Sequence, residues 1–164
     1  MINRMMLFSW VAAAGLLAGC GDSHHEHHAG EKPHKHEHTP PHGGTPVVLG
    51  KEQYHLEFVL EATSGLMQLY VLDGHMENYV RLTNTTLAVS AQVGGQSQAL
   101  SFIAAATPAS GETVGDTSLF EARAEWLKTT TNFDATIKVL TIRGARFENV
   151  TFNFPKGNEP HAAP

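Results

Sequence analysis

The amino-acid sequence predicts an all-β domain, an antiparallel β-sandwich over residues 45–155. Short runs rich in β-branched and aromatic residues recur at a spacing of roughly 8–12 residues, separated by turn signals. Strands do not alternate with long helical segments, so a parallel sheet is not expected. The chain has 164 residues, which suffices for one domain with a core of useful size.

The first strands are the clearest. A short strand is expected at 46–49 and a longer one at 53–62, where Tyr54, Leu56, Phe58 and Leu60 alternate with His55, Glu57, Val59 and Glu61. Thr63-Ser64-Gly65 predicts a hairpin turn into a partner strand at 66–72, and Asp73-Gly74 predicts the next turn. This pairing would bring residues 53–55 opposite 72–73.

The middle of the chain continues the pattern. A short strand is expected at 79–82, and strands at 86–93 and 98–104 are joined by a turn at Gly94-Gly95. A loop rich in small residues follows at 105–117.

Residues 118–130 have a mixed pattern. Strand-like alternation begins the segment, but good helix formers follow, so 118–122 is expected to be extended and 124–129 to form a short helix or turn. A last hairpin, 134–142 with 146–154, turns at Gly144, and a bulge near Asn149 is expected. Eight or nine strands with one short helix favour an immunoglobulin- or cupredoxin-like sandwich. The polar segment 156–164 is expected to be a flexible tail.

The N-terminus has the features of a bacterial lipoprotein signal. Arg4 precedes an apolar run, Met5 to Leu17, which is within the ~7–15 residues expected of a secretion signal. Leu17-Ala18-Gly19-Cys20 then matches a lipoprotein box, so residues 1–19 are expected to be cleaved and Cys20, the chain's one cysteine, to be lipidated. The alternative is an ordinary signal peptide with a chance cysteine. Because glycine follows Cys20 and Asp22 lies one place later, a periplasm-facing anchor in the outer membrane is favoured over the inner membrane.

Residues 20–44 are expected to be a disordered, histidine-rich tether. Eight of the eleven histidines lie between His24 and His42, with too few apolar residues to form a core. Imidazole is a ligand for divalent copper, zinc, nickel and cobalt, and a flexible tract would bind such ions with little selectivity. The alternative is a polar or pH-responsive spacer. The candidate ligands are His24, His25, His27, His28, His34, His36, His38 and His42.

The strand that contains His55 carries a second set of candidate ligands. His55 and Glu57 lie two positions apart and project from one face, while Asp73 and His75 follow the partner strand. One or two further imidazoles and a carboxylate would make a zinc or copper site of ordinary composition. The alternative is that His55 and Glu57 belong to a solvated strand face and that Asp73 only forms a turn.

Three short motifs resemble a known module. His42-Gly43-Gly44, Tyr54-His55-x-Glu57 and the strand ending at Asp73 are similar to a β-sandwich of bacterial envelope proteins. That module occurs in small lipoproteins with histidine-rich leaders and in extensions of periplasmic adaptors of heavy-metal efflux systems. The resemblance covers about residues 41–154. It implies metal handling without catalysis, with His42, His55, Glu57 and Asp73 as ligands.

Charge and composition narrow the function classes. The formal charge is −5 and basic residues are scattered, so nucleic acid is not an expected partner. No nucleophile motif occurs, and neither an enzyme nor a small-molecule substrate is expected. The sequence favours a lipid-anchored periplasmic protein that captures or buffers a divalent transition metal and passes it to an efflux or other envelope partner. The alternative is a non-metal interaction module of the envelope, with the histidine tract as a tether.

Overall fold

In the computed structural model, residues 39–159 are described, and they form an antiparallel all-β fold, as expected. The expected signal peptide, Cys20 and the histidines from His24 to His38 lie outside the described residues. The described elements are β1 (Thr45–Leu49), β2 (Tyr54–Glu61), β3 (Leu66–Asp73), β4 (Thr86–Val93), β5 (Gln96–Ala104), η1 (Pro108–Ser110), β6 (Leu119–Arg123), η2 (Glu125–Lys128), β7 (Phe133–Ile142) and β8 (Ala145–Phe154). η1 and η2 are 3-10 helices.

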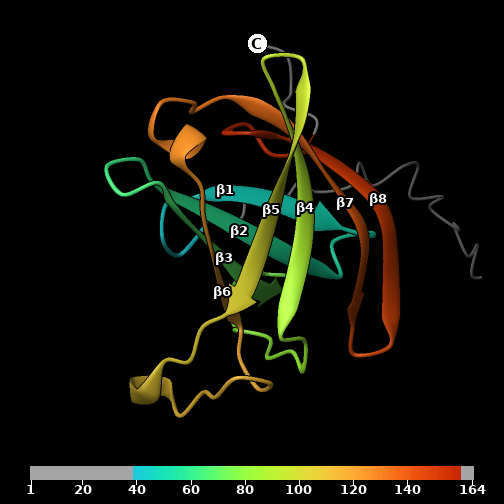
Figure 1. The fold of residues 1–164 in the computed structure, drawn as a ribbon. Helices are drawn as coiled ribbons and strands as arrows, with labels where there is room; N and C mark the ends of the chain where they lie inside the picture. The colour runs from blue at the N-terminus through green and yellow to red at the C-terminus, as the bar shows by residue number, and fades with distance from the viewer. Residues whose placement is uncertain (1–38, 160–164) are drawn as a thin grey trace, which may run out of the picture. The chain divides into compact units, whose positions relative to one another are not determined.

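The eight strands belong to one nearly closed sheet with the order β1-β2-β3-β6-β5-β4-β7-β8. β5 and β6 pair over two positions, Ile103 opposite Glu121 and Ala104 opposite Phe120, and the amide of Ala105 adds a hydrogen bond to the Leu119 carbonyl. This short pairing divides the sheet into two four-stranded halves. In Figure 1, β1 to β3 cross the view while β4, β5, β7 and β8 run up and down it. The halves of the expected sandwich are therefore hydrogen-bonded to each other.

The core lies between the two halves. Alternate residues of each strand point inward, and Phe58 of β2 packs on Phe152 of β8 and Phe102 of β5, with ring centroids 4.6 and 5.8 Å apart. All three rings are buried. Because burying one such side chain stabilises a fold by about 1.5–3 kcal/mol, this aromatic contact contributes substantially to holding the halves together.

Local details differ from the expectation at two places. Residues 79–82 form no strand: Tyr79 and Leu82 make isolated bridges to Leu72 and Thr117. At Asn149, whose φ is +50°, no residue is inserted, since the pairing register of β7 with β8 is the same on both sides. The first long hairpin follows the expected register, with His55 opposite Leu72.

The two outer strands, β1 and β8, are connected by the turn that follows β8. Asn158 accepts a hydrogen bond from the Val48 amide (2.8 Å) and donates one to the Val48 carbonyl (3.0 Å), so its side chain pairs as a strand neighbour would. The Thr45 hydroxyl donates to the Pro155 carbonyl. Asn158 lies in the segment expected to be flexible, yet it is bonded to the sheet.

The outer face of β2, where His55 and Glu57 lie, is also covered. Both side chains are fully buried. Residues 40–44, which precede β1, lie over this face at Glu57, and residues 78–80 extend the edge of β3 beyond the end of β6. Within 39–159, no helix is long and apolar enough to cross a membrane.

Candidate functional site

Glu57 is a buried carboxylate on the outer face of the sheet. Its Oε1 accepts hydrogen bonds from the backbone amides of His42 (2.8 Å) and Gly44 (2.9 Å). Its Oε2 lies 2.8 Å from Nδ1 of the His42 ring. These three contacts compensate for the removal of a carboxylate from water, which would otherwise cost several kcal/mol.

The segment Pro40–Gly44, which we call the strap, reaches Glu57 because of its two glycines. Gly43 adopts φ +67° and donates its amide to the Pro40 carbonyl at 3.0 Å, which closes a turn. Gly44 lies so near β2 that a Cβ there would be 2.6 Å from the Phe58 carbonyl oxygen. The His-Gly-Gly motif thus has a structural reason: only glycine lets the strap approach the strand so closely.

The imidazole of His42 is held from three sides. It stacks on Tyr70 with ring centroids 3.8 Å apart, and its Nε2 lies 3.3 Å from the Tyr79 hydroxyl. An ionised carboxylate can only accept hydrogen bonds, so the Glu57 contact assigns a proton to Nδ1. In the neutral ring, Nε2 then carries the lone pair. Carboxylates orient metal-binding and proton-transferring histidines in the same way.

His42 opens on a pocket of about 270 Å³. The side chain of His42 is 31% exposed, and Tyr79 is 49% exposed. The pocket therefore offers a ring nitrogen, hydroxyl groups and a carboxylate to a ligand from solvent. Its lining residues are His42, Tyr70, Tyr79, Thr107, Ser110, Glu112, Ser118 and Leu119.

A second buried carboxylate, Glu112, forms part of this pocket. It accepts hydrogen bonds from the Ser118 amide (3.1 Å), the Ser118 hydroxyl (2.7 Å) and the Thr117 hydroxyl (3.2 Å). Burial raises the pKa of Glu112, but the bonds from Ser118 and Thr117 and the nearby Arg81 outweigh burial, so the pKa is lowered overall. Glu112 is therefore ionised at neutral pH, and the Arg81 guanidinium lies beside it, with its Nε 3.7 Å from Oε1 of Glu112.

The two tyrosines are kept protonated. Burial raises the pKa of Tyr79, and the negative charges of Glu57 and Glu112 raise it further. Burial also raises the pKa of Tyr70, with smaller contributions from Tyr79, Glu57 and Glu121. Both therefore present neutral hydroxyl groups at neutral pH.

Of the four ligands expected in the folded domain, the structure brings His42 and Glu57 into contact. His55 is buried, and its Nδ1 lies 3.2 Å from the backbone carbonyl of Asp73. The Asp73 carboxylate closes its own turn by accepting bonds from the amides of His75 and Glu77 and from the Asn78 side chain. Although burial raises the pKa of Asp73, these bonds and one from the Asn78 amide lower it overall.

No group of three or more His, Cys, Asp or Glu side chains suited to a metal occurs within residues 39–159. Among these residues, His55 and Asp73 therefore do not join a second histidine in such a group. A metal at His42 would need donors of another kind.

Sequence reasoning did not identify Tyr70, Tyr79 and Glu112 as site residues. The position of Tyr70 could have been predicted, because the hairpin register places Tyr70 directly opposite Glu57. Tyr79 and Glu112 belong to irregular segments, and no periodic signal predicts where such residues meet.

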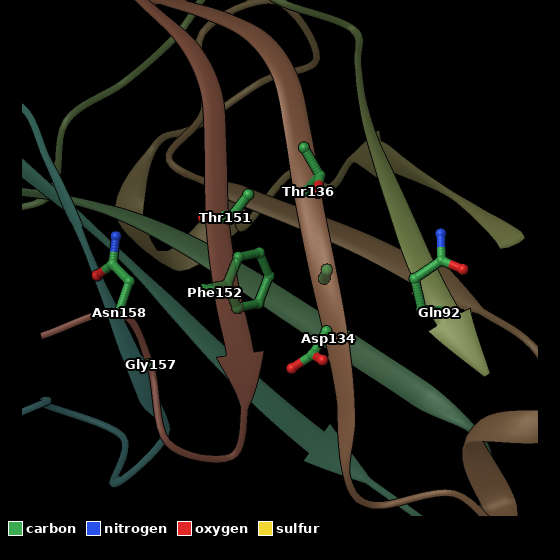
Figure 2. Close-up of a pocket in the computed structure, with 8 residues that line it drawn as sticks. Gln92, Asp134, Thr136, Thr151, Phe152, Gly157 and Asn158 are labelled. Atoms are coloured by element: carbon green, nitrogen blue, oxygen red, sulfur yellow. The ribbon is translucent and has the colours of Figure 1, made fainter. Parts of the chain in front are cut away.

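A different hollow lies on the far half of the sheet. Its volume is about 500 Å³. Figure 2 shows residues that line it: Gln92 of β4, Asp134 and Thr136 of β7, Thr151 and Phe152 of β8, and Asn158. The Asp134 carboxylate accepts a hydrogen bond from Asn153 at 2.8 Å. This hollow has no imidazole, so the His42 pocket is the better candidate for a metal.

Comparisons of this chain with protein-family models, with curated proteins and with solved structures find no match.

Proposed function

We propose that this chain is a lipid-anchored, periplasm-facing protein that binds a divalent transition metal and delivers it to an efflux or other envelope partner. The observation that carries the proposal is the Glu57–His42 pair. A fully buried carboxylate holds Nδ1 of an imidazole that lines a pocket and is 31% exposed, and the Tyr79 hydroxyl lies 3.3 Å from its Nε2.

The donors present fit a borderline metal ion. Metal-binding histidines almost always donate their second ring N–H to a carboxylate, a carbonyl or a water, which fixes the ring and raises its basicity. Neutral imidazole suits copper, zinc, nickel and cobalt. Glu57 has both oxygens engaged by the strap, so the proposal gives it an orienting role and gives His42 the coordinating role.

The histidine tract supplies further donors. His38 lies four positions before His42 in the sequence, and seven candidate ligands lie between His24 and His38. A tract of this composition captures ions readily but selects poorly among them, since it imposes little geometry. The oriented His42 supplies geometry, and Cys20 supplies the lipid anchor. The resemblance to envelope modules of metal-efflux systems also supports a role in metal binding.

A calorimetric titration with Cu(II), Zn(II) and Ni(II) tests the proposal. It uses the mature protein and a full-length variant with every histidine from His24 to His38 changed to asparagine, so that His42 is the only candidate ligand left N-terminal to the sheet. The unaltered protein should bind several ions and the variant about one. In that variant background, His42→Ala should abolish the remaining site.

Glu57→Gln should weaken the remaining site by about 10- to 100-fold, as loss of an orienting partner does elsewhere. His75→Ala, which alters an exposed histidine, is the control and should leave it unchanged. If the unaltered protein binds no more than one weak ion, and His42→Ala does not affect it, the chain is not a metal collector. The interaction-module alternative would then be favoured.

A further inference from the structure

The hydroxyl of Tyr79 and Nε2 of His42 are 3.3 Å apart, and both residues line the pocket. We propose that Tyr79 is the second protein ligand of the metal at His42 and that it binds the metal through its phenolate oxygen. This inference rests on the proposed function. It gives the site one imidazole and one phenolate donor, and tyrosine is not among the usual His, Cys, Asp and Glu ligands.

The separation of the two donors fits coordination to one ion. Zinc and similar ions bind nitrogen and oxygen donors at about 2.0–2.2 Å, and two such donors at a tetrahedral angle are about 3.3–3.5 Å apart. As a hydrogen bond, 3.3 Å is long, since bonds between nitrogen and oxygen span about 2.7–3.2 Å. The two atoms are therefore spaced as neighbouring ligands and are only weakly bonded to each other.

Both donors are held in place by the fold. His42 is fixed by Glu57 and by stacking on Tyr70. Tyr79 is bridged to Leu72, and the backbone on either side of it is hydrogen-bonded to β3, from Val80 to Val71 (2.8 Å) and from Asp73 to Asn78 (2.9 Å). The His42 ring and the Tyr79 backbone are therefore held before an ion binds, which reduces the ordering cost of coordination.

Asp73 acts on this site from a distance. Its carboxylate closes the turn over residues 75–78 immediately before Tyr79. We therefore assign Asp73 as a positioning residue for Tyr79. This gives a role to a residue that the sequence singled out as a ligand.

The chemistry of binding balances simply. As the bond from the metal to the Tyr79 oxygen forms, the hydroxyl proton leaves to buffer. Burial and the negative charges of Glu57 and Glu112 raise the pKa of the free Tyr79 hydroxyl, so the phenolate depends on the positive charge of the ion itself. The same carboxylates attract a cation, and Arg81, 3.7 Å from Glu112, offsets part of this attraction. Water can complete the coordination of the ion. A phenolate is a hard ligand, so the site should take Cu(II) in preference to Cu(I).

Absorption spectroscopy of the Cu(II)-loaded protein tests the assignment. The full-length variant without the histidines of 24–38 is titrated with Cu(II), and a phenolate-to-copper charge-transfer band should appear with one equivalent. Tyr79→Phe keeps the ring and removes only the oxygen. It should abolish the band and weaken copper binding by tenfold or more, while His42-dependent binding persists.

Tyr54 is not among the residues that line the pocket, so it serves as the matched control, and Tyr54→Phe should retain the band. Asp73→Asn should weaken the band, and Asn78→Ala should do so by a similar factor. Unfolding curves establish that each variant is folded. For Tyr79→Phe a second measurement is independent of its stability: addition of Zn(II) to the parent variant should produce a tyrosinate difference spectrum.

The outcomes separate the two proposals. If Cu(II) binds in a His42-dependent way but no charge-transfer band appears, or if the band survives in Tyr79→Phe, the Tyr79 assignment is wrong and the proposed function stands. If the parent variant shows no His42-dependent copper binding, the proposed function fails at this site and the Tyr79 assignment fails with it.

Discussion

Glu57 and Glu112 are two buried carboxylates that the protein stabilises in the same way. Each accepts hydrogen bonds from a backbone amide and from at least one side chain of a neighbouring segment. Such charge-assisted bonds are stronger than neutral ones, and the desolvated oxygens require them. Both residues lie next to the pocket, so the same bonds that hold irregular segments on the sheet also place two carboxylates beside the site, one of them paired with Arg81.

Glu112 leads to a prediction about pH and stability. Its pKa in the folded protein lies below the ordinary value of 4.5, so its contribution is full above pH 4.5 and is lost as the pH falls through the folded-state pKa. At pH 7, Glu112→Gln should lower the free energy of unfolding by about 1–3 kcal/mol. The difference from the unaltered protein should shrink as the pH falls below about 4.

Urea denaturation at pH 7, 5 and 3.5 measures this difference. Glu148→Gln is the control because Glu148 is an exposed residue whose side chain is 54% accessible, and its effect should stay within about 0.5 kcal/mol. A difference for Glu112→Gln that is the same at every pH would mean that its carboxylate is not what stabilises this region.

At the scale of elements, the strap over residues 40–44 decides whether the site exists. It contains no strand or helix, and its contacts with β2 are the bonds to Glu57 and the close approach of Gly44. Each of the two adjacent positions requires glycine for a different physical reason. Gly43 needs its positive φ, whereas Gly44 needs the absence of a Cβ.

Alanine at each glycine should separate these reasons. Gly43→Ala should cost about 1–2 kcal/mol of stability, because only the left-handed backbone conformation is penalised and nothing lies within 4 Å of the new Cβ. Gly44→Ala should lift the strap from β2 and should cost about 2–4 kcal/mol. Hydrogen exchange provides the measurement: the backbone amides of His42 and of position 44 should lose protection in Gly44→Ala and keep most of it in Gly43→Ala. Equal loss in both variants would contradict the steric explanation.

At the scale of the whole described domain, the free edges of β1 and β8 are the weak place in the sheet. Unpaired edge strands invite pairing with other chains. Here the side chain of Asn158 occupies the edge of β1 at Val48, 110 positions earlier in the chain. The turn after β8 therefore both stabilises the nearly closed sheet and covers part of an edge.

Replacing Asn158 should open this edge. Asn158→Ala should lower the free energy of unfolding by about 1–2 kcal/mol, since two hydrogen bonds are lost, and the Val48 amide should exchange faster. Asn158→Asp keeps the oxygen that accepts from the Val48 amide but loses the donor to the Val48 carbonyl, so it should retain amide protection while losing part of the stability. If the Val48 amide is equally protected in Asn158→Ala, the side chain does not hold the edge.

Much of the fold follows from local features of the chain. Alternation in residues 54–61 and the turn residues 63–65 predict a hairpin and its register, which the structure confirms. The short helix also occurs near its expected place, as a 3-10 helix over Glu125–Lys128. The strand expected at 79–82 does not form: Tyr79 and Leu82 make isolated bridges to two different segments, at Leu72 and at Thr117. A segment of four residues is too short for its periodicity to distinguish a strand from isolated bridges.

The sequence by itself determined the all-β class, most strand positions and the fact that His55 and Glu57 share one face of β2. These properties depend on residues a few positions apart, whose side-chain directions the backbone geometry dictates. Only the tertiary structure decided that Glu57 meets His42, that Tyr79 lies at Nε2 of that histidine, and that Asn158 pairs with Val48. Those contacts join segments 15, 37 and 110 positions apart, and they depend on how the sheet curls and where irregular segments cross it, which no local pattern in the sequence encodes.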